Sequence, residues 1–439
     1  MPTTTSVTPP RAPSLLAEER LLVAAGKLAR DAGDEGSAVA AVRDRGFSWA
    51  RALELAATHR VKPLLARSIE DVPGLRDLAP PDVRRALGRA RLQAATRAER
   101  VAAALAPVLT ELEAAGVPVV LLKGAALLAT IQPPGTRSLG DVDLLVRRPD
   151  YARVAAALVA HGFEKRLEPG RTERALLADH HEIAFVRRGK GEPVDIDLHW
   201  RLFPRDRAFS IPTGDLIARS RPVRFGGAPA LALSPEDAVV HYATQIGIDF
   251  LLLSFGRAAD IHALVASGPV DWRRLCRIAR DAGAAGVTHL ALSLAAGLGA
   301  EVPGFVFARL ETASPGCGTA SAVLADGRLA FRRLVVRSAA KVLLMPLLYD
   351  RLRNRLAALL TLPLPSYGSA ANVQILRPGD PSRPGAAGGL GACLRRARVL
   401  VLAAACGVAL VAFAGARTLG RRGLAARIRE AFWRPANGE

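Results

Sequence analysis

Two aspartates separated by one residue, Asp141 and Asp143, form the pattern in this chain that most clearly suggests chemistry. They begin an apolar run of strand-forming residues that continues to Val146. On a strand, side chains two residues apart project from the same face, so both carboxylates would lie together. Two anions that close repel each other unless a cation lies between them, and Mg²⁺ prefers oxygen ligands. The pair predicts a metal-binding strand, although such pairs also occur at solvated strand ends.

A second alternating segment follows at residues 193–200, with the sequence Pro-Val-Asp-Ile-Asp-Leu-His-Trp. Asp195, Asp197 and His199 would share one face of this strand. Paired beside the first strand, it would complete a site of three carboxylates. Such a site suits phosphoryl or nucleotidyl transfer with two metal ions, one activating the attacking oxygen and one stabilising the leaving pyrophosphate.

Residues 117–128 indicate a short buried strand, a turn at Gly124 and the start of a helix. A glycine in that turn lets backbone N–H groups approach a phosphate at the positive end of the helix. Lys123 could add a positive charge to the same anion. The alternative explanation is an ordinary strand-to-helix turn with a solvated lysine.

This ordered set of a glycine turn, an Asp-x-Asp strand and a later acidic strand resembles the polymerase-β-like nucleotidyltransferase superfamily. More narrowly, the chain is similar to the bacterial proteins described as uncharacterised nucleotidyltransferases. One departure is Gly124-Ala125, where the superfamily generally has Gly-Ser or Gly-Gly, so a serine hydroxyl contact to phosphate is missing and backbone N–H groups must serve. The resemblance covers roughly residues 45 to 305 and is carried by segments 122–124, 137–146, 162–163, 197–200, 233–237 and 271–272.

The resemblance implies Mg²⁺-dependent transfer of a nucleoside monophosphate from an NTP to a hydroxyl or phosphate acceptor, with release of pyrophosphate. Asp197 would take the proton from the acceptor hydroxyl, with Asp195 as its rival. Asp197 is preferred because Leu-His-Trp follows it, as in the family motif. The expected metal ligands, for two Mg²⁺ ions, are Asp141, Asp143 and Asp197, and the expected nucleotide-binding residues are Lys123, Gly124, Arg137 and Ser138.

Two other functions stay open at this stage. The first is a catalytically inactive member of the fold that binds a nucleotide or a protein partner. The second is a transferase that modifies RNA ends, such as those of tRNA, which the formal charge of +20 would suit. Nucleic acid is the less favoured partner, because aromatic residues are only 5% and do not interleave with basic residues to form a stacking platform. The sequence names neither the acceptor nor the preferred base.

His180, His181 and Glu182 precede a strand-like segment that we expect to pair with the Asp197 strand. The imidazoles would then lie near the acceptor pocket, and His199 could orient Asp197 or a substrate phosphate. The alternative is that these histidines are half-buried residues at a strand end. Residues interpreted as structural in a later helical region are His241, Asp260 and His262.

Several common enzyme classes lack their motifs in this sequence. It has no P-loop, no Gly-x-Gly-x-x-Gly after a strand, no Gly-x-Ser-x-Gly and no His-Glu-x-x-His. The cysteines at 276, 317, 393 and 406 lack Cys-x-x-Cys spacing, which argues against a zinc site and a disulfide framework and suits a reducing cytoplasm.

The order of the expected helices and strands along the 439 residues favours an α+β fold. In it, a small mixed β-sheet is flanked by N-terminal and C-terminal helical regions. Helical spacing covers 14–30, 48–59 and 81–115, and Ser234 has the features of a helix N-cap. The expected organisation is a disordered N-terminus (1–13), an N-terminal helical region (14–116), the nucleotidyltransferase core (117–233), a C-terminal helical region (234–376), a Pro/Gly-rich linker (377–393) and a basic tail (394–439).

The basic tail contains residues 399–416, which are eighteen residues without a charge between arginine clusters. A membrane span needs about 20 apolar residues, with roughly 17 as the lower limit. Arginines on both sides give no clear orientation. A cytoplasmic protein is slightly favoured, and membrane association through this segment is the alternative.

Overall fold

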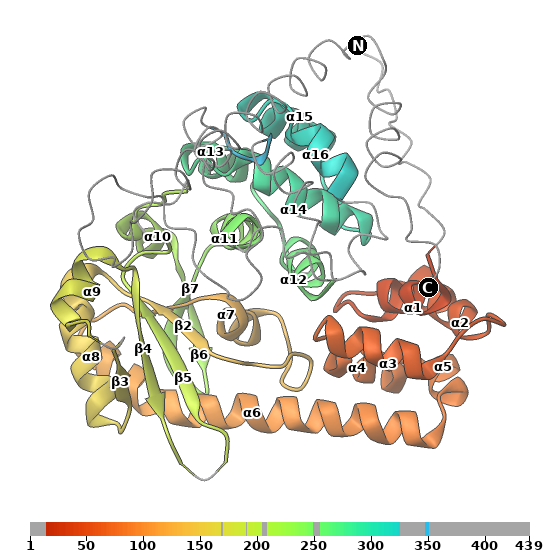
Figure 1. Ribbon diagram of the computed structural model, residues 1–439, viewed down its shortest axis with the longest axis horizontal. Coiled ribbons are helices and arrows are strands. Elements are labelled where there is room, and N and C mark those ends of the chain that lie inside the picture. The colour runs from red at the N-terminus through yellow and green to blue at the C-terminus, as the bar shows by residue number, and fades with distance from the viewer. Residues whose placement is uncertain are drawn as a thin grey trace, which may run out of the picture.

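The computed structural model describes residues 15–167, 170–189, 191–203, 209–248, 255–324 and 347–350. Within them, a mixed sheet of seven strands lies between one long helix and groups of shorter helices (Figure 1). This architecture confirms the expected α+β fold with helical regions around a mixed sheet. The strands are β1 (Val120–Leu121), β2 (Val142–Leu145), β3 (Glu164–Arg166), β4 (Glu182–Arg187), β5 (Val194–His199), β6 (Arg221–Phe225) and β7 (Ala228–Ala232).

The strand order β3-β4-β5-β2-β1-β7-β6 places the two acidic strands, β2 and β5, side by side. These two strands run parallel, as do β1 and β7, and the other neighbouring pairs are antiparallel. In this register Asp143 lies opposite Asp197, and His199 lies opposite Glu182. Neighbouring strands are about 4.8 Å apart, so these four residues occupy one patch on one face of the sheet.

The other face of the acidic strands is apolar and packs on α6 (Pro81–Ala114) and α8 (Tyr151–Ala160). Because side chains alternate along a strand, Val142, Leu144 and Ile196 point away from the carboxylates and are buried in this core. Burying a side chain of this size stabilises the fold by about 1.5–3 kcal/mol. The apolar alternation therefore fixes which face of the sheet carries the acidic residues.

The N-terminal helical region differs in one detail from the expected pattern. A single helix was predicted over 14–30, but α1 ends earlier. Asp31 is the N-cap of α2, and its Oδ1 accepts from the Asp34 amide at 2.8 Å. A Cβ at Gly26 would lie 2.6 Å from the Phe255 ring, so the end of α1 packs closely on a C-terminal helix. The helices here are α1 (Ala17–Ala25), α2 (Ala32–Val42), α3 (Trp49–Thr58), α4 (Lys62–Asp71), α5 (Pro73–Leu78) and α6.

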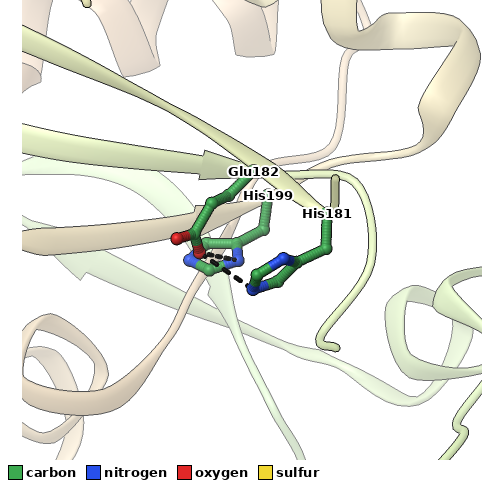
Figure 2. A group of neighbouring side chains, drawn as sticks. All are labelled: His181, Glu182 and His199. Carbon is green, nitrogen blue, oxygen red and sulfur yellow. Dashed lines mark ion pairs between the residues drawn. The ribbon is translucent and has the colours of Figure 1, made fainter. Parts of the chain in front are cut away.

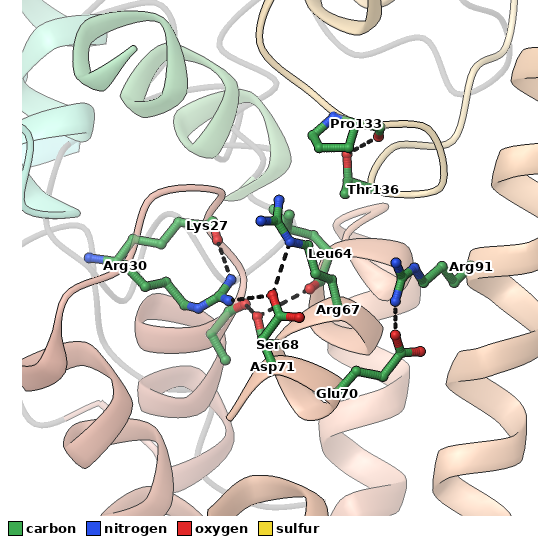
Figure 3. A network of polar contacts seen from close by, with 11 residues as sticks. Lys27, Arg30, Leu64, Arg67, Ser68, Glu70, Asp71, Arg91, Pro133 and Thr136 are labelled. Atoms are coloured by element: carbon green, nitrogen blue, oxygen red, sulfur yellow. Dashed lines mark hydrogen bonds and ion pairs between the residues drawn. The ribbon is translucent and has the colours of Figure 1, made fainter. Parts of the chain in front are cut away.

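A polar network near the end of α4 connects these helices (Figure 3). Arg30 and Arg67 both reach Asp71 Oδ2, at 3.1 and 3.0 Å. Arg91 of α6 forms an ion pair with Glu70 of α4. The carboxylates of both ion pairs are exposed, and such pairs contribute only about 0–1 kcal/mol each.

The helices after the sheet pack against the N-terminal helices and the end of β2 in one shared core, which includes Leu22, Leu65, Leu145 and Leu290. The predicted N-cap at Ser234 is confirmed for α11, because the Ser234 Oγ accepts from the Asp237 amide at 3.2 Å. The remaining elements are α7 (Lys123–Thr130), a 3-10 turn (Arg148–Asp150), α9 (Glu173–Asp179), α10 (Thr213–Arg219), α11 (Pro235–Ile248), α12 (Phe255–Ala266), α13 (Trp272–Asp281), α14 (Ala285–Gly297), α15 (Gly304–Ala313) and α16 (Cys317–Leu324).

In the part of the chain that the structure describes, no helix combines the length and apolar character needed to cross a membrane. The apolar segment 399–416 lies outside the described residues, as do the expected N-terminus (1–13) and the linker (377–393).

Candidate active site

Asp143 of β2 is the buried centre of the acidic patch, with only 3% of its surface exposed. Its Oδ1 receives Lys123 Nζ at 2.6 Å and lies 3.0 Å from His199 Nε2. Burial alone would raise the pKa of Asp143, but the hydrogen bond from His199 and the charge of Lys123 outweigh it and hold that pKa well below its usual range. Asp143 is therefore ionised and already balanced by two basic groups.

Lys123 reaches Asp143 from the turn between β1 and α7. Its backbone has φ +44°, in the left-handed region that residues with a side chain rarely adopt. Such a conformation costs about 1–3 kcal/mol and is concentrated at functional sites. The turn was predicted at Gly124, but the left-handed residue is the lysine itself. Burial would lower the pKa of Lys123, and the neighbouring Asp143 charge raises it above its ordinary value.

Gly124 serves close packing at this turn. A Cβ there would lie 3.1 Å from both Arg137 Nε and Leu139 Cδ1. The Arg137 guanidinium forms an ion pair with Asp260 of α12, which also accepts from Gln132 Nε2 at 3.2 Å. Arg137 is thus engaged by a helix, and its predicted contact with a nucleotide phosphate stays a prediction.

Asp197 of β5 is partly buried and lies opposite Asp143 in the register. Burial and the negative charges of Glu182 and Asp143 raise the pKa of Asp197 to about 7. Asp195, its rival, lies opposite Val186 and pairs with Arg166 Nη1 at 3.3 Å. The register therefore places Asp197, and not Asp195, beside Asp143.

Two other predicted site residues lie on the loop before β2. Asp141 directly precedes β2 and is exposed, and Ser138 is exposed on the loop that leads to it. His241 of α11 is buried, and burial together with the positive charge of Lys123 lowers its pKa to about 3. His241 is therefore a buried, neutral side chain, in line with its interpretation as structural.

The residue that sequence reasoning undervalued is Glu182. Its Oε2 lies 3.0 Å from His199 Nδ1 and 3.2 Å from His181 Nε2, so the carboxylate stands between two imidazoles (Figure 2). Burial alone would raise the pKa of Glu182, but the hydrogen bond from His181 and the charge of His199 lower it to about 2. The hairpin pairing of β4 with β5 was predicted, and a correct register would have placed Glu182 on the Asp197 face.

Three residues in this cluster lie close enough together to hold a metal ion. One ligand atom from each of His181, Glu182 and His199 lies within 4.8 Å of the other two. The three predicted aspartate ligands are not part of this group of His181, Glu182 and His199, as far as the described residues go. Metal binding by Asp141, Asp143 and Asp197 accordingly stays a prediction.

Residues 45–299, which are more than half of the 439 residues, match the model of a family described as uncharacterised nucleotidyltransferase. The chain belongs to this family.

Among solved structures, the chain is similar to MenT4, described as a nucleotidyltransferase toxin from Mycobacterium tuberculosis H37Rv. The two share 13% identity at a TM-score of 0.30, over 62% of this chain and 94% of MenT4. No curated protein matches the sequence.

Proposed function

We propose that this nucleotidyltransferase moves a nucleoside monophosphate from an NTP to a hydroxyl or phosphate acceptor and releases pyrophosphate, with Mg²⁺ as cofactor. The observation that carries the proposal is the register of β2 and β5, which sets Asp143 opposite Asp197 on adjacent parallel strands. Membership of the family supports the reaction type. The acceptor and the preferred base are left open.

The residues present fit a hard divalent cation. Asp143 and Asp197 offer oxygen ligands on one face, and Asp141 lies two residues before Asp143 on the exposed side. Lys123 and His199 both contact Oδ1 of Asp143, so neither contact uses Oδ2. Carboxylates held this close repel one another, and a divalent cation relieves that repulsion.

Each side chain then has a distinct proposed role. Asp141 and Asp143 hold the cation, and Asp197 also binds it and takes the proton from the acceptor hydroxyl. Bound Mg²⁺ would supply charge neutralisation for the triphosphate and the acceptor oxygen. Lys123 exchanges its contact with Asp143 for a phosphate oxygen when NTP binds.

The first α7 backbone N–H groups, beside Gly124, offer the same phosphates hydrogen bonds at the positive end of a helix dipole. Ser138 is exposed on the approach to β2 and is proposed as a further polar contact with the nucleotide. Arg137 would join them only by loosening its ion pair with Asp260.

The matched pair Asp197→Asn and Asp195→Asn tests this assignment. Both changes remove one carboxylate from the same strand with almost no change in volume. Loss of a general base lowers the rate by about 10²–10⁴-fold, so Mg²⁺-dependent pyrophosphate release should fall by that factor in Asp197→Asn and stay near normal in Asp195→Asn. The reverse pattern would assign the general-base role to Asp195. Equal, small effects in both variants would refute a general-base role for either aspartate.

A further inference from the structure

The cluster of His181, Glu182 and His199 is built from two paired strands at the edge of the acidic patch. His181 directly precedes β4, Glu182 begins β4, and His199 ends the neighbouring strand β5. Figure 2 shows the Glu182 carboxylate directed between the two imidazole rings, whose centroids are 5.5 Å apart. The three side chains therefore converge from the start of β4 and the end of β5.

His199 is the most constrained member of this cluster, because only 4% of its side chain is exposed. Its Nε2 lies 3.0 Å from Asp143 Oδ1. Its Nδ1 is buried and, among the described residues, makes no well-aligned hydrogen bond, although it lies 3.0 Å from Glu182 Oε2. One ring nitrogen is thus held by a carboxylate, and the other is directed into the cluster.

This is the arrangement in which proteins present histidine to a metal. A ligating imidazole usually donates its second N–H to a carboxylate, which fixes the tautomer and the ring orientation. With Nε2–H donated to Asp143, the Nδ1 lone pair faces the cluster. Asp143 would then act as the orienting carboxylate, and Nδ1 as the ligand.

We propose that His181 Nε2, His199 Nδ1 and the Glu182 carboxylate form a binding site for a divalent transition-metal ion of the zinc class. Two imidazole nitrogens and one carboxylate oxygen suit Zn²⁺ and its neighbours, whereas Mg²⁺ prefers oxygen ligands alone. The site is distinct from the Mg²⁺ site proposed at the aspartates.

The exposure of the cluster is graded in a way that suits an open coordination site. His199 is buried at its base, while the His181 and Glu182 side chains are 21% and 34% exposed. An ion held by three protein ligands would keep a position for water on the exposed side. Such an ion would also hold His199 against Asp143, so it would stabilise the position of Asp143 on β2.

The sequence alone did not reveal this site. Its ligands come from two strands, so they match no local zinc motif, and cysteine spacing argued against zinc. The proposal rests on the three residues themselves and does not depend on the reaction proposed above.

Cobalt(II) binding to the intact chain tests the proposal, because Co²⁺ replaces zinc-class ions and its visible absorption reports the ligands. The metal-free protein is titrated with Co²⁺ in a large excess of Mg²⁺, with no nucleotide present. The variant is His181→Ala, which removes one partly exposed ligand and leaves the His199–Asp143 contact intact. The matched control is His180→Ala, the adjacent histidine, whose ring contacts Arg171 instead.

We expect one Co²⁺ per chain in the unmodified protein and in His180→Ala, with a spectrum of nitrogen and oxygen ligation. Affinity should fall by at least about tenfold in His181→Ala, as losses around metal ligands typically do. Zn²⁺ should raise the thermal midpoint of the unmodified chain and not that of His181→Ala, because an ion that binds only the folded state stabilises it.

Three results would overturn the proposal. Absence of tight Co²⁺ binding in excess Mg²⁺ would mean that a proton on His199, and not a metal, balances Asp143 and Glu182. Equal Co²⁺ affinity in His181→Ala and the unmodified chain would place the ion elsewhere. A spectrum dominated by sulfur-to-cobalt charge transfer would assign the ion to a cysteine. None of these readouts requires nucleotidyl transfer, so the outcome is independent of that activity.

Discussion

At the scale of single residues, one carboxylate oxygen organises the site. Asp143 Oδ1 receives a lysine from the turn after β1 and a histidine from the end of β5. Both partners come from other elements, so three segments of the chain meet at Asp143. The same two partners keep the pKa of Asp143 well below its usual range.

Lys123 has a charge near the proposed phosphates and a strained backbone, and two substitutions separate these properties. Lys123→Met removes the charge and keeps the strain of φ +44°, whereas Lys123→Gly removes both. A left-handed residue with a side chain is about 1–2 kcal/mol less favourable than glycine, so Lys123→Gly should unfold at higher urea concentration than Lys123→Met.

Activity of the same two variants tests the role of the ammonium group. If the charge binds the triphosphate, both variants should lose about tenfold in kcat/KM for NTP, which corresponds to about 1.4 kcal/mol. Steady-state rates of pyrophosphate release would measure the loss. Normal kcat/KM in Lys123→Gly would show that the lysine is dispensable for nucleotide binding.

At the scale of secondary-structure elements, the turn of the β6–β7 hairpin packs closely on α6. Its turn residues Gly226 and Gly227 have φ +60° and +81°. A Cβ at Gly226 would lie 2.9 Å from Ala102 Cβ of α6 and 3.0 Å from its backbone oxygen, whereas a Cβ at Gly227 meets nothing within 4 Å. The two glycines share a backbone requirement but differ in packing.

This difference predicts unequal effects of alanine at the two positions. Both changes impose the same type of backbone strain, and Gly226→Ala adds overpacking against a helix backbone that costs about 1–3 kcal/mol. Urea unfolding should therefore show Gly226→Ala to be the less stable variant by that amount. Equal free energies of unfolding would mean that the hairpin does not rest on α6.

The elements and the pairing of β5 with its neighbours were more predictable from the sequence than the register of that pairing. Alternation of apolar and polar residues predicted β2 and β5, and Ser234 predicted the start of α11, because these signals are local. The register that sets Glu182 opposite His199 depends on how two strands meet, which local patterns do not encode. The end of α1 was missed, and the residue that follows it, Gly26, packs closely on Phe255 of a helix distant in the sequence.

At the scale of the whole molecule, the helices after the sheet brace the loop that leads into β2. Arg137 on that loop pairs with Asp260 of α12, and Gln132 donates to the same carboxylate. The side chain of Asp260 is only 6% exposed. Residues far apart in the sequence thus fix the approach to the Asp141–Asp143 strand.

A double-mutant cycle with Arg137→Met and Asp260→Asn tests this brace. Each single change leaves one charged or polar partner buried without its counterpart, which typically destabilises a protein by about 3–5 kcal/mol. The double variant should lose less than the sum, with a coupling free energy of about 0.5–3 kcal/mol in urea unfolding. Strict additivity would contradict a direct interaction.

The activity proposed for the Asp141–Asp143 strand is metal-dependent transfer of a nucleotide. The most direct measurement incubates the intact chain with each of the four α-labelled NTPs, Mg²⁺ and a cell extract as the source of acceptor, and follows pyrophosphate release together with transfer of label. We predict transfer with at least one NTP that stops when Mg²⁺ is chelated and when both aspartates are changed to asparagine. Transfer that persists in that double variant, or absence of transfer with all four NTPs, would contradict the account.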